Sequence, residues 1–168
     1  MTLVQQRSTL AQRMVGVVLA TMLLVAVGAP HSAEALGTFN WYSKTSPLKV
    51  AKDGKEAWGY GTWSLLNEST GLRSRMQGER RTLNGDDKNM AKATLVTEFR
   101  NCSTCSWQTH KQVTTSSYWG NSWQSFNVST DLPTGGSHAR GRIRVTLDRR
   151  SFKPDAHSSW IYKGPTSY

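Results

Sequence analysis

A chain of 168 residues with 21 Lys and Arg against 11 Asp and Glu has a formal net charge of +10, which favours anionic partners over basic ones. Seven Trp, five Tyr and four Phe, with abundant Ser, Thr and Gly, favour an all-β domain over a helical one. Because the chain has only two cysteines, a zinc site built from two cysteine pairs is excluded.

Residues 1–35 have the pattern of a secretory signal peptide. Arg7 and Arg13 give a positive start, an uncharged apolar run follows at 14–29, and Ala-Glu-Ala at 33–35 supplies a small-x-small cleavage pattern. A membrane anchor is the alternative, but the run is shorter than the roughly 20 residues needed to cross the hydrocarbon core. We therefore expect cleavage and a secreted protein, in surroundings that permit a disulfide.

The rest of the chain predicts one domain. Segment 36–54 is expected to be an irregular lead-in, and 55–168 a single antiparallel β-sandwich, immunoglobulin-like or jelly-roll-like, of about seven strands. Turn signals separate the strands, and Asn84-Gly85 is the strongest hairpin signal among them. The expected strands are 56–67, 71–83, two arms of a hairpin over 91–113, 121–130, 138–149 and 158–162.

The hairpin over 91–113 carries both cysteines of the chain, Cys102 and Cys105, between its two alternating arms. A zinc half-site would need two further ligands, and a thioredoxin-like redox pair would precede a helix, for which the following sequence shows no pattern. Both alternatives remain open, but the position between two strands favours a structural disulfide at the hairpin tip.

Arginines alternate with apolar residues in the segment 140–147. Arg140, Arg142 and Arg144 are expected on one face of a strand, with Ile143, Val145 and Leu147 on the other. The pair Arg73 and Arg75 repeats the arrangement in an earlier strand. Guanidinium groups recognise phosphate, sulfate and carboxylate with paired hydrogen bonds, so these five arginines are candidates for binding a polyanion. The alternative is a solvated outer face, with Glu98 or Asp148 as internal partners.

Other candidate residues are fewer. Tyr118 and Trp119 lie in a predicted loop, where aromatic rings can stack on sugars or close one end of a sandwich. The histidines His110, His138 and His157 are neither in metal-ligand spacing nor beside a nucleophile motif, so no catalytic residue, metal or cofactor is predicted. Sequons occur at three positions, Asn67, Asn101 and Asn127.

One resemblance to a known group of proteins rests on three features of the sequence. These are the segment Gly59-Tyr60-Gly61-Thr62-Trp63, the Asn/Gly/Asp turn after it, and the Ser/Thr-rich strands with Trp and Arg. In these features the chain resembles small secreted proteins of unknown function from actinobacteria. The resemblance implies export and an all-β fold, and it assigns no functional residues.

These observations lead to one main hypothesis and two alternatives. The main hypothesis is a secreted, non-catalytic protein that binds an anionic polymer, such as a cell-wall polymer, an acidic polysaccharide or nucleic acid. The first alternative is an antimicrobial or toxin-like effector that directs the same basic surface at membranes. The second is a secreted hydrolase whose site the motifs do not reveal.

Overall fold

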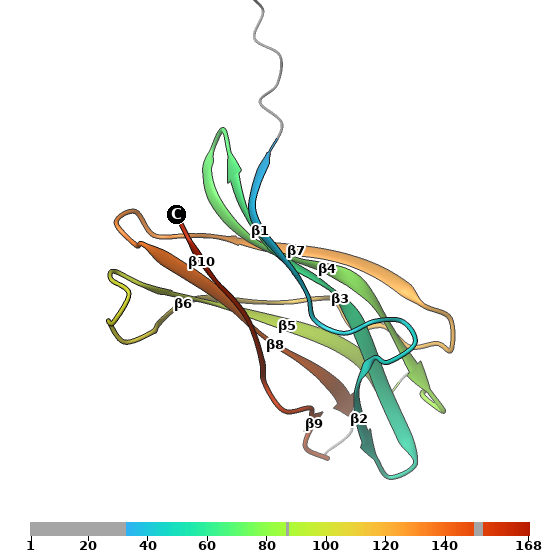
Figure 1. Ribbon diagram of the computed structural model, residues 1–168. Coiled ribbons are helices and arrows are strands. Elements are labelled where there is room, and N and C mark those ends of the chain that lie inside the picture. Colours follow the sequence, from blue (N-terminus) through green and yellow to red (C-terminus); the bar gives the residue numbers. More distant parts are fainter. Residues whose placement is uncertain (1–32, 87, 150–152) are drawn as a thin grey trace, which may run out of the picture. The chain divides into compact units, whose positions relative to one another are not determined.

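The computed structural model describes residues 33–86, 88–149 and 153–168 of the chain (Figure 1). The apolar run 14–29 and nearly all of the predicted signal peptide lie outside these residues. Within them, no helix is long and apolar enough to cross a membrane.

The described residues form an all-β sandwich, which confirms the predicted fold class. Their strands number ten rather than about seven: β1 Glu34–Asn40, β2 Leu48–Lys52, β3 Lys55–Glu68, β4 Gly71–Leu83, β5 Asn89–Arg100, β6 Gln108–Thr114, β7 Gln124–Asp131, β8 His138–Arg149, β9 Ala156–His157 and β10 Ile161–Ser167. The expectation of an irregular lead-in at 36–54 is wrong, because most of that segment belongs to β1 and β2. Both strands pair with β3: β2 through a tight hairpin, and β1 through long-range hydrogen bonds that local patterns do not reveal.

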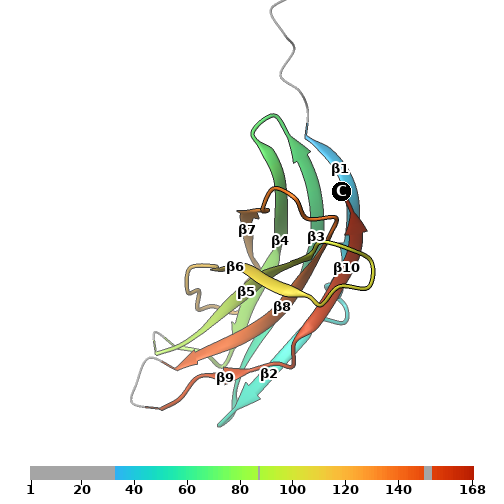
Figure 2. The ribbon, with the colours of Figure 1, turned by 90° about the vertical axis from the view of Figure 1, so that its left-hand side faces the viewer.

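The strands form two antiparallel sheets. Sheet A has the order β1-β3-β4-β7 with β2 also paired to β3, and sheet B has the order β10-β8-β5-β6 with β9 also paired to β8. Figures 1 and 2 show the two sheets as separate layers. Strands β3, β4 and β7 take the places of strands A, B and E of an immunoglobulin-type sandwich, and β5, β8 and β10 those of C, F and G.

Two turn sequences differ in the strands that they connect. Asp53 and Gly54 have positive φ angles of 51° and 73° and join β2 to β3, as a two-residue hairpin turn requires. Asn84 also has a positive φ, of 54°, but Asn84-Gly85 does not close a hairpin. The chain crosses there from β4 in sheet A to β5 in sheet B. The dipeptide specifies a sharp bend, whereas strand pairing is decided by the sequence on both sides of it.

The core lies between the sheets and is centred on fully buried Trp41, Trp63 and Leu95. The indole nitrogen of Trp63 donates to the hydroxyl oxygen of Ser74 at 2.8 Å, which satisfies a polar group inside the core. Gly141 of β8 lies against the same ring, and a Cβ there would come within 2.5 Å of it. The space for Trp63 therefore depends on a glycine in the opposite sheet.

The cysteine hairpin is confirmed as β5 paired with β6. Cys102 and Cys105 are joined across the connecting loop as a disulfide, with their Cα atoms 5.1 Å apart. Ala91, Ala93 and Leu95 of β5 are all buried in the core. Both cysteine sulfurs are thus used in a covalent link that closes the hairpin tip.

Candidate functional site

The outer face of sheet B carries arginines and aromatic rings side by side. Strand β8 alternates between half-buried and buried residues over most of its length, so Arg140, Arg142 and Arg144 lie on the outer face and Ile143, Val145 and Leu147 lie in the core, as predicted. Antiparallel pairing places Tyr162 of β10 beside Arg142 and Glu98 of β5 beside Arg140. We call the outer-face cluster the sheet B ladder: Arg100, Trp107, Arg140, Arg142, Arg144, Trp160 and Tyr162.

The rings of the sheet B ladder each contact at least one guanidinium group. The Trp107 centroid lies 4.6 Å from the guanidinium carbon of Arg100 and 4.3 Å from that of Arg140. Arg140 also lies 4.5 Å from the Tyr162 ring. The Trp160 centroid is 4.7 Å from Arg142 and 4.4 Å from Arg144. These are cation–π distances, and each contact stabilises a cation by about 0.5–1 kcal/mol at exposed positions.

One carboxylate, that of Glu98, lies within the sheet B ladder. It accepts from Nε of Arg140 at 2.7 Å and is 3.5 Å from Nη1 of Arg142, and its side chain is only 6% exposed. Arg144 has no carboxylate within ion-pair distance among the described residues. The predicted partner Glu98 is therefore confirmed for two arginines. Asp148 instead binds Lys92, at 2.7 Å.

Glu98 takes Nε of Arg140 and lies near Nη1 of Arg142, which leaves the other terminal nitrogens of these arginines for a ligand. A guanidinium group binds a ring through its flat face and oxyanions through the N–H groups at its edge, so the two contacts do not compete. The Nε atoms of Arg142 and Arg144 are buried and have no hydrogen-bond partner. Each of these two residues as a whole is only half-buried. The rings hold the cations in a row along the strand, about 7 Å apart.

The structure does not bring all five candidate arginines together. Arg73 and Arg75 lie on the outer face of sheet A, in β4, whereas Arg140, Arg142 and Arg144 belong to sheet B. Arg73 and Arg75 both contact the carboxylate of Glu68 at 2.9 Å. They form a separate ion-pair cluster, so the candidate site is limited to the sheet B ladder.

The two candidate loop aromatics have different roles. Backbone hydrogen bonds join Tyr118 to Ala91 of β5 in both directions, so Tyr118 is held as part of the sandwich. Its ring lies 5.9 Å from the guanidinium group of Arg80. Trp119 is 56% exposed, and of the two it alone presents its ring to solvent.

Sequence patterns alone did not identify the ladder rings as parts of a site. Trp160 and Tyr162 stand two residues apart, which is a strand-like signal for a shared face, but their contact with β8 depends on the pairing of β10 with β8. Trp107 begins the second arm of the cysteine hairpin and reaches Arg140 across β5. In both cases the signal is local and the partner is distant in sequence.

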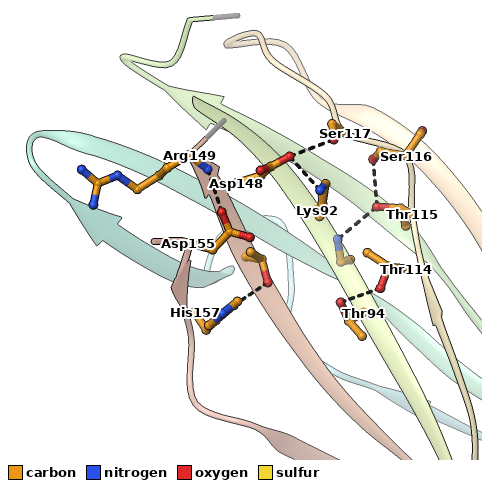
Figure 3. A network of polar contacts seen from close by, with 12 residues as sticks. Lys92, Thr94, Thr114, Thr115, Ser116, Ser117, Asp148, Arg149, Asp155 and His157 are labelled. Carbon is orange, nitrogen blue, oxygen red and sulfur yellow. Dashed lines mark hydrogen bonds and ion pairs between the residues drawn. The ribbon is translucent and has the colours of Figure 1, made fainter. Parts of the chain in front are cut away.

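A network of polar contacts lies at the far end of the same face (Figure 3). Asp148 accepts from Ser117 at 3.1 Å and binds Lys92, which ties β8 to β5 and to the loop after β6. The hydroxyl group of Thr146 bonds Nδ1 of His157 at 2.9 Å, which ties β8 to β9. Burial and the nearby Arg144 lower the pKa of His157. These contacts fasten strands together and give the network a structural role.

Metal-binding clusters and glycosylation sequons are two further features to consider on the surface. In the described ranges, no three His, Cys, Asp or Glu side chains gather closely enough to hold a metal ion. The three sequon asparagines are exposed: Asn67, Asn101 and Asn127.

Comparison with known proteins found no matching family model, no matching curated protein and no matching solved structure. The assignment of a function therefore rests on the geometry of the chain itself.

Proposed function

We propose that this protein acts outside the cell, where it binds a linear anionic polymer through the sheet B ladder. The observation that carries the proposal is the charge imbalance of that ladder. Arg100, Arg140, Arg142 and Arg144 lie together on one face, and among the described residues Glu98 is the one carboxylate within ion-pair distance of any of them. Like charges this close repel unless anions neutralise them, and a polymer with repeating anionic groups does so along the whole row.

The rings of the ladder favour recognition of charge over stacking. Trp107 and Trp160 each contact two guanidinium groups already, so they support cations rather than offer an open platform. A polymer bearing phosphate or sulfate groups at regular intervals matches a row of bidentate donors. The formal net charge of +10 supports the same partner class, since it draws polyanions towards the protein.

The test must separate loss of binding from loss of folding. Replacing Arg140, Arg142 and Arg144 alone would leave the buried Glu98 carboxylate without a cation, and a stranded buried charge destabilises the fold. The variant is therefore R140Q/R142Q/R144Q/E98Q, which lowers the net charge by two. A matched control is K52Q/K88Q, which removes two exposed lysines outside the ladder.

Retention of residues 36–168 on immobilised linear polyphosphate is the measurement. We expect the wild-type chain to bind and to elute with salt, because neutralised anions release counterions. The ladder variant should lose about tenfold or more in affinity at moderate salt, and its salt dependence should become shallower by about one counterion per arginine. The lysine control should bind within about twofold of wild type. Equal losses in both variants would mean that only net charge matters, and the proposal would fall.

Parallel columns identify the source of the anions. Teichoic acid presents phosphate on an alditol, heparin presents sulfate on a sugar, and single-stranded DNA presents phosphate on a nucleoside. The polymer that retains the protein to the highest salt concentration identifies the class of anion. Anionic lipid vesicles form a further arm. Binding to vesicles without binding to any soluble polymer would contradict the proposal and favour a membrane-directed effector.

A further inference from the structure

The outer face of sheet A carries a second row of cations and rings, which we call the sheet A ladder: Lys49, Trp58, Arg81 and Trp123. Pairing of β2 with β3 sets Lys49 beside Trp58, and pairing of β3 with β4 sets Trp58 beside Arg81. The Lys49 ammonium lies 4.0 Å from the Trp58 centroid. Arg81 lies 4.5 Å from Trp58 and 4.4 Å from Trp123. The row therefore runs across the strands of sheet A.

The cations of the sheet A ladder are not neutralised by nearby carboxylates. Glu56 accepts from the indole nitrogen of Trp58 at 2.5 Å, and Glu79 accepts from the hydroxyl group of Tyr60 and lies 3.8 Å from Lys44. Neither Lys49 nor Arg81 is within ion-pair distance of a carboxylate in the described part of the chain. The row repeats the chemistry of the sheet B ladder: cations held against rings, with donor groups left for an anion.

From these two rows we infer that the protein is bivalent: the sheet A ladder binds a second stretch of the same anionic polymer, and one protein molecule bridges two polymer segments. The inference rests on the proposed function of the sheet B ladder. In a sandwich the two outer faces point away from each other, separated by a core about 10 Å thick and the side chains of both sheets. A polymer segment lying along one face cannot reach the other, so each face takes its own segment.

Bridging can be measured separately from binding. Two pools of linear polyphosphate, one biotinylated and one fluorescent, are mixed with residues 36–168, and fluorescence captured on streptavidin reports bridging. Binding to each pool alone is measured in parallel by fluorescence anisotropy. Captured fluorescence should rise and then fall as protein concentration increases, because excess protein saturates every segment individually.

The decisive variant is K49Q/R81Q, compared with K52Q/K88Q, which lowers the net charge equally. We expect K49Q/R81Q to bind a single pool within about threefold of wild type and to lose about tenfold or more of the captured fluorescence. The lysine control should bridge like wild type. The single variant Lys49→Gln, at an exposed position, should show an intermediate loss and serves if the double variant is destabilised.

The outcomes separate the two proposals. Bridging that persists in K49Q/R81Q would overturn the inference, including the case in which two copies of the chain associate and each contributes its sheet B ladder. Binding of single pools by wild type without any bridging would also overturn it and leave the proposed function intact. Loss of all binding by wild type would remove the proposed function itself.

Discussion

At the scale of single residues, Arg80 departs most from the usual placement of charge. It is a β4 residue that points into the sandwich, is only 3% exposed, and has two buried nitrogens, Nε and Nη1, without a hydrogen-bond partner. Its Nη2 donates to the carbonyl oxygen of Ser116 at 3.0 Å, and its guanidinium group lies 5.5 Å from the Phe126 ring. Burial lowers the pKa of Arg80, which shows that the site disfavours the charge.

We predict that Arg80→Met raises the free energy of unfolding by about 1 kcal/mol. Methionine fills a similar volume and contacts the same rings without a desolvated charge. Urea unfolding monitored by tryptophan fluorescence measures the change. Arg81→Met serves as the neighbouring control and should give no gain, because Arg81 lies on the outer face between Trp58 and Trp123. A loss of stability in Arg80→Met would show that the bonds to Ser116 outweigh desolvation.

Tyr60 supplies a second prediction at this scale. Burial, its hydrogen bond to Glu79 and the charge of that carboxylate raise the pKa of Tyr60 to about 12. Since the folded protein holds this proton more tightly than the unfolded chain, the contribution to stability is complete below about pH 10 and is lost as pH rises towards 12. Glu79→Gln should lower the pKa of one tyrosine towards 10, as seen in the ultraviolet absorbance of phenolate. An unchanged titration would contradict the assignment.

At the scale of an element, β8 combines a core face and an arginine-bearing outer face in one strand. Ile143→Ala should lower the free energy of unfolding by about 2–4 kcal/mol through the cavity left in the core. Arg144→Gln should lower it by less than about 1 kcal/mol, since Arg144 has no ion-pair partner among the described residues and loses only its contact with Trp160. Urea unfolding and polyphosphate retention together measure both effects.

For polymer binding, the ranking of the two β8 variants should be reversed, with Arg144→Gln the more strongly affected. Arg144→Gln should weaken retention although it folds normally, whereas Ile143→Ala should bind like wild type at temperatures where it is folded. If Arg144→Gln unfolds the domain while Ile143→Ala does not, the two faces of β8 have been assigned the wrong roles.

The tip of the β5–β6 hairpin is the second element with a testable property. The disulfide between Cys102 and Cys105 closes a very short loop, so it removes little entropy from the unfolded chain. The double variant C102S/C105S should therefore cost about 2 kcal/mol or less and keep its polymer binding. Mass spectrometry after alkylation without reduction should find no free thiol in the folded protein. Two alkylated cysteines would instead favour a redox function.

At the scale of the whole sandwich, the arrangement of the sheets decides what each ladder can reach. The immunoglobulin-type order places β4 and β8 in different sheets, so Arg73 and Arg75 lie on one outer face and Arg140, Arg142 and Arg144 lie on the opposite one. The sequence named five arginines as candidates for binding a polyanion, and the structure separates them into two regions. Arg73 and Arg75 neutralise Glu68 in one, whereas Arg140, Arg142 and Arg144 lie among rings in the other.

Strand alternation and the hairpin could be read without the structure. The outward direction of Arg140, Arg142 and Arg144 and the inward direction of Ile143 follow from the two-residue period of a strand, which is fixed by local backbone geometry. The bounds of β4 and β8 also match the predicted segments, 71–83 and 138–149, since turn residues flank both. Likewise, the spacing of the two cysteines predicted a disulfide at the hairpin tip, because Cys102 and Cys105 are only three residues apart in the chain.

Partners that are distant in the chain were decided by the tertiary structure alone. The contacts of Arg140 with Trp107 and Tyr162 require β5 to separate β6 from β8, and β10 to lie along the other edge of β8. The place of β1, the crossover at Asn84-Gly85 and the contacts of Arg81 with Trp58 and Trp123 also depend on residues that are distant in the chain. A strand period states which face a side chain occupies. Which strand lies beside it depends on how both sheets bury their apolar faces together, and that is a property of the folded chain as a whole.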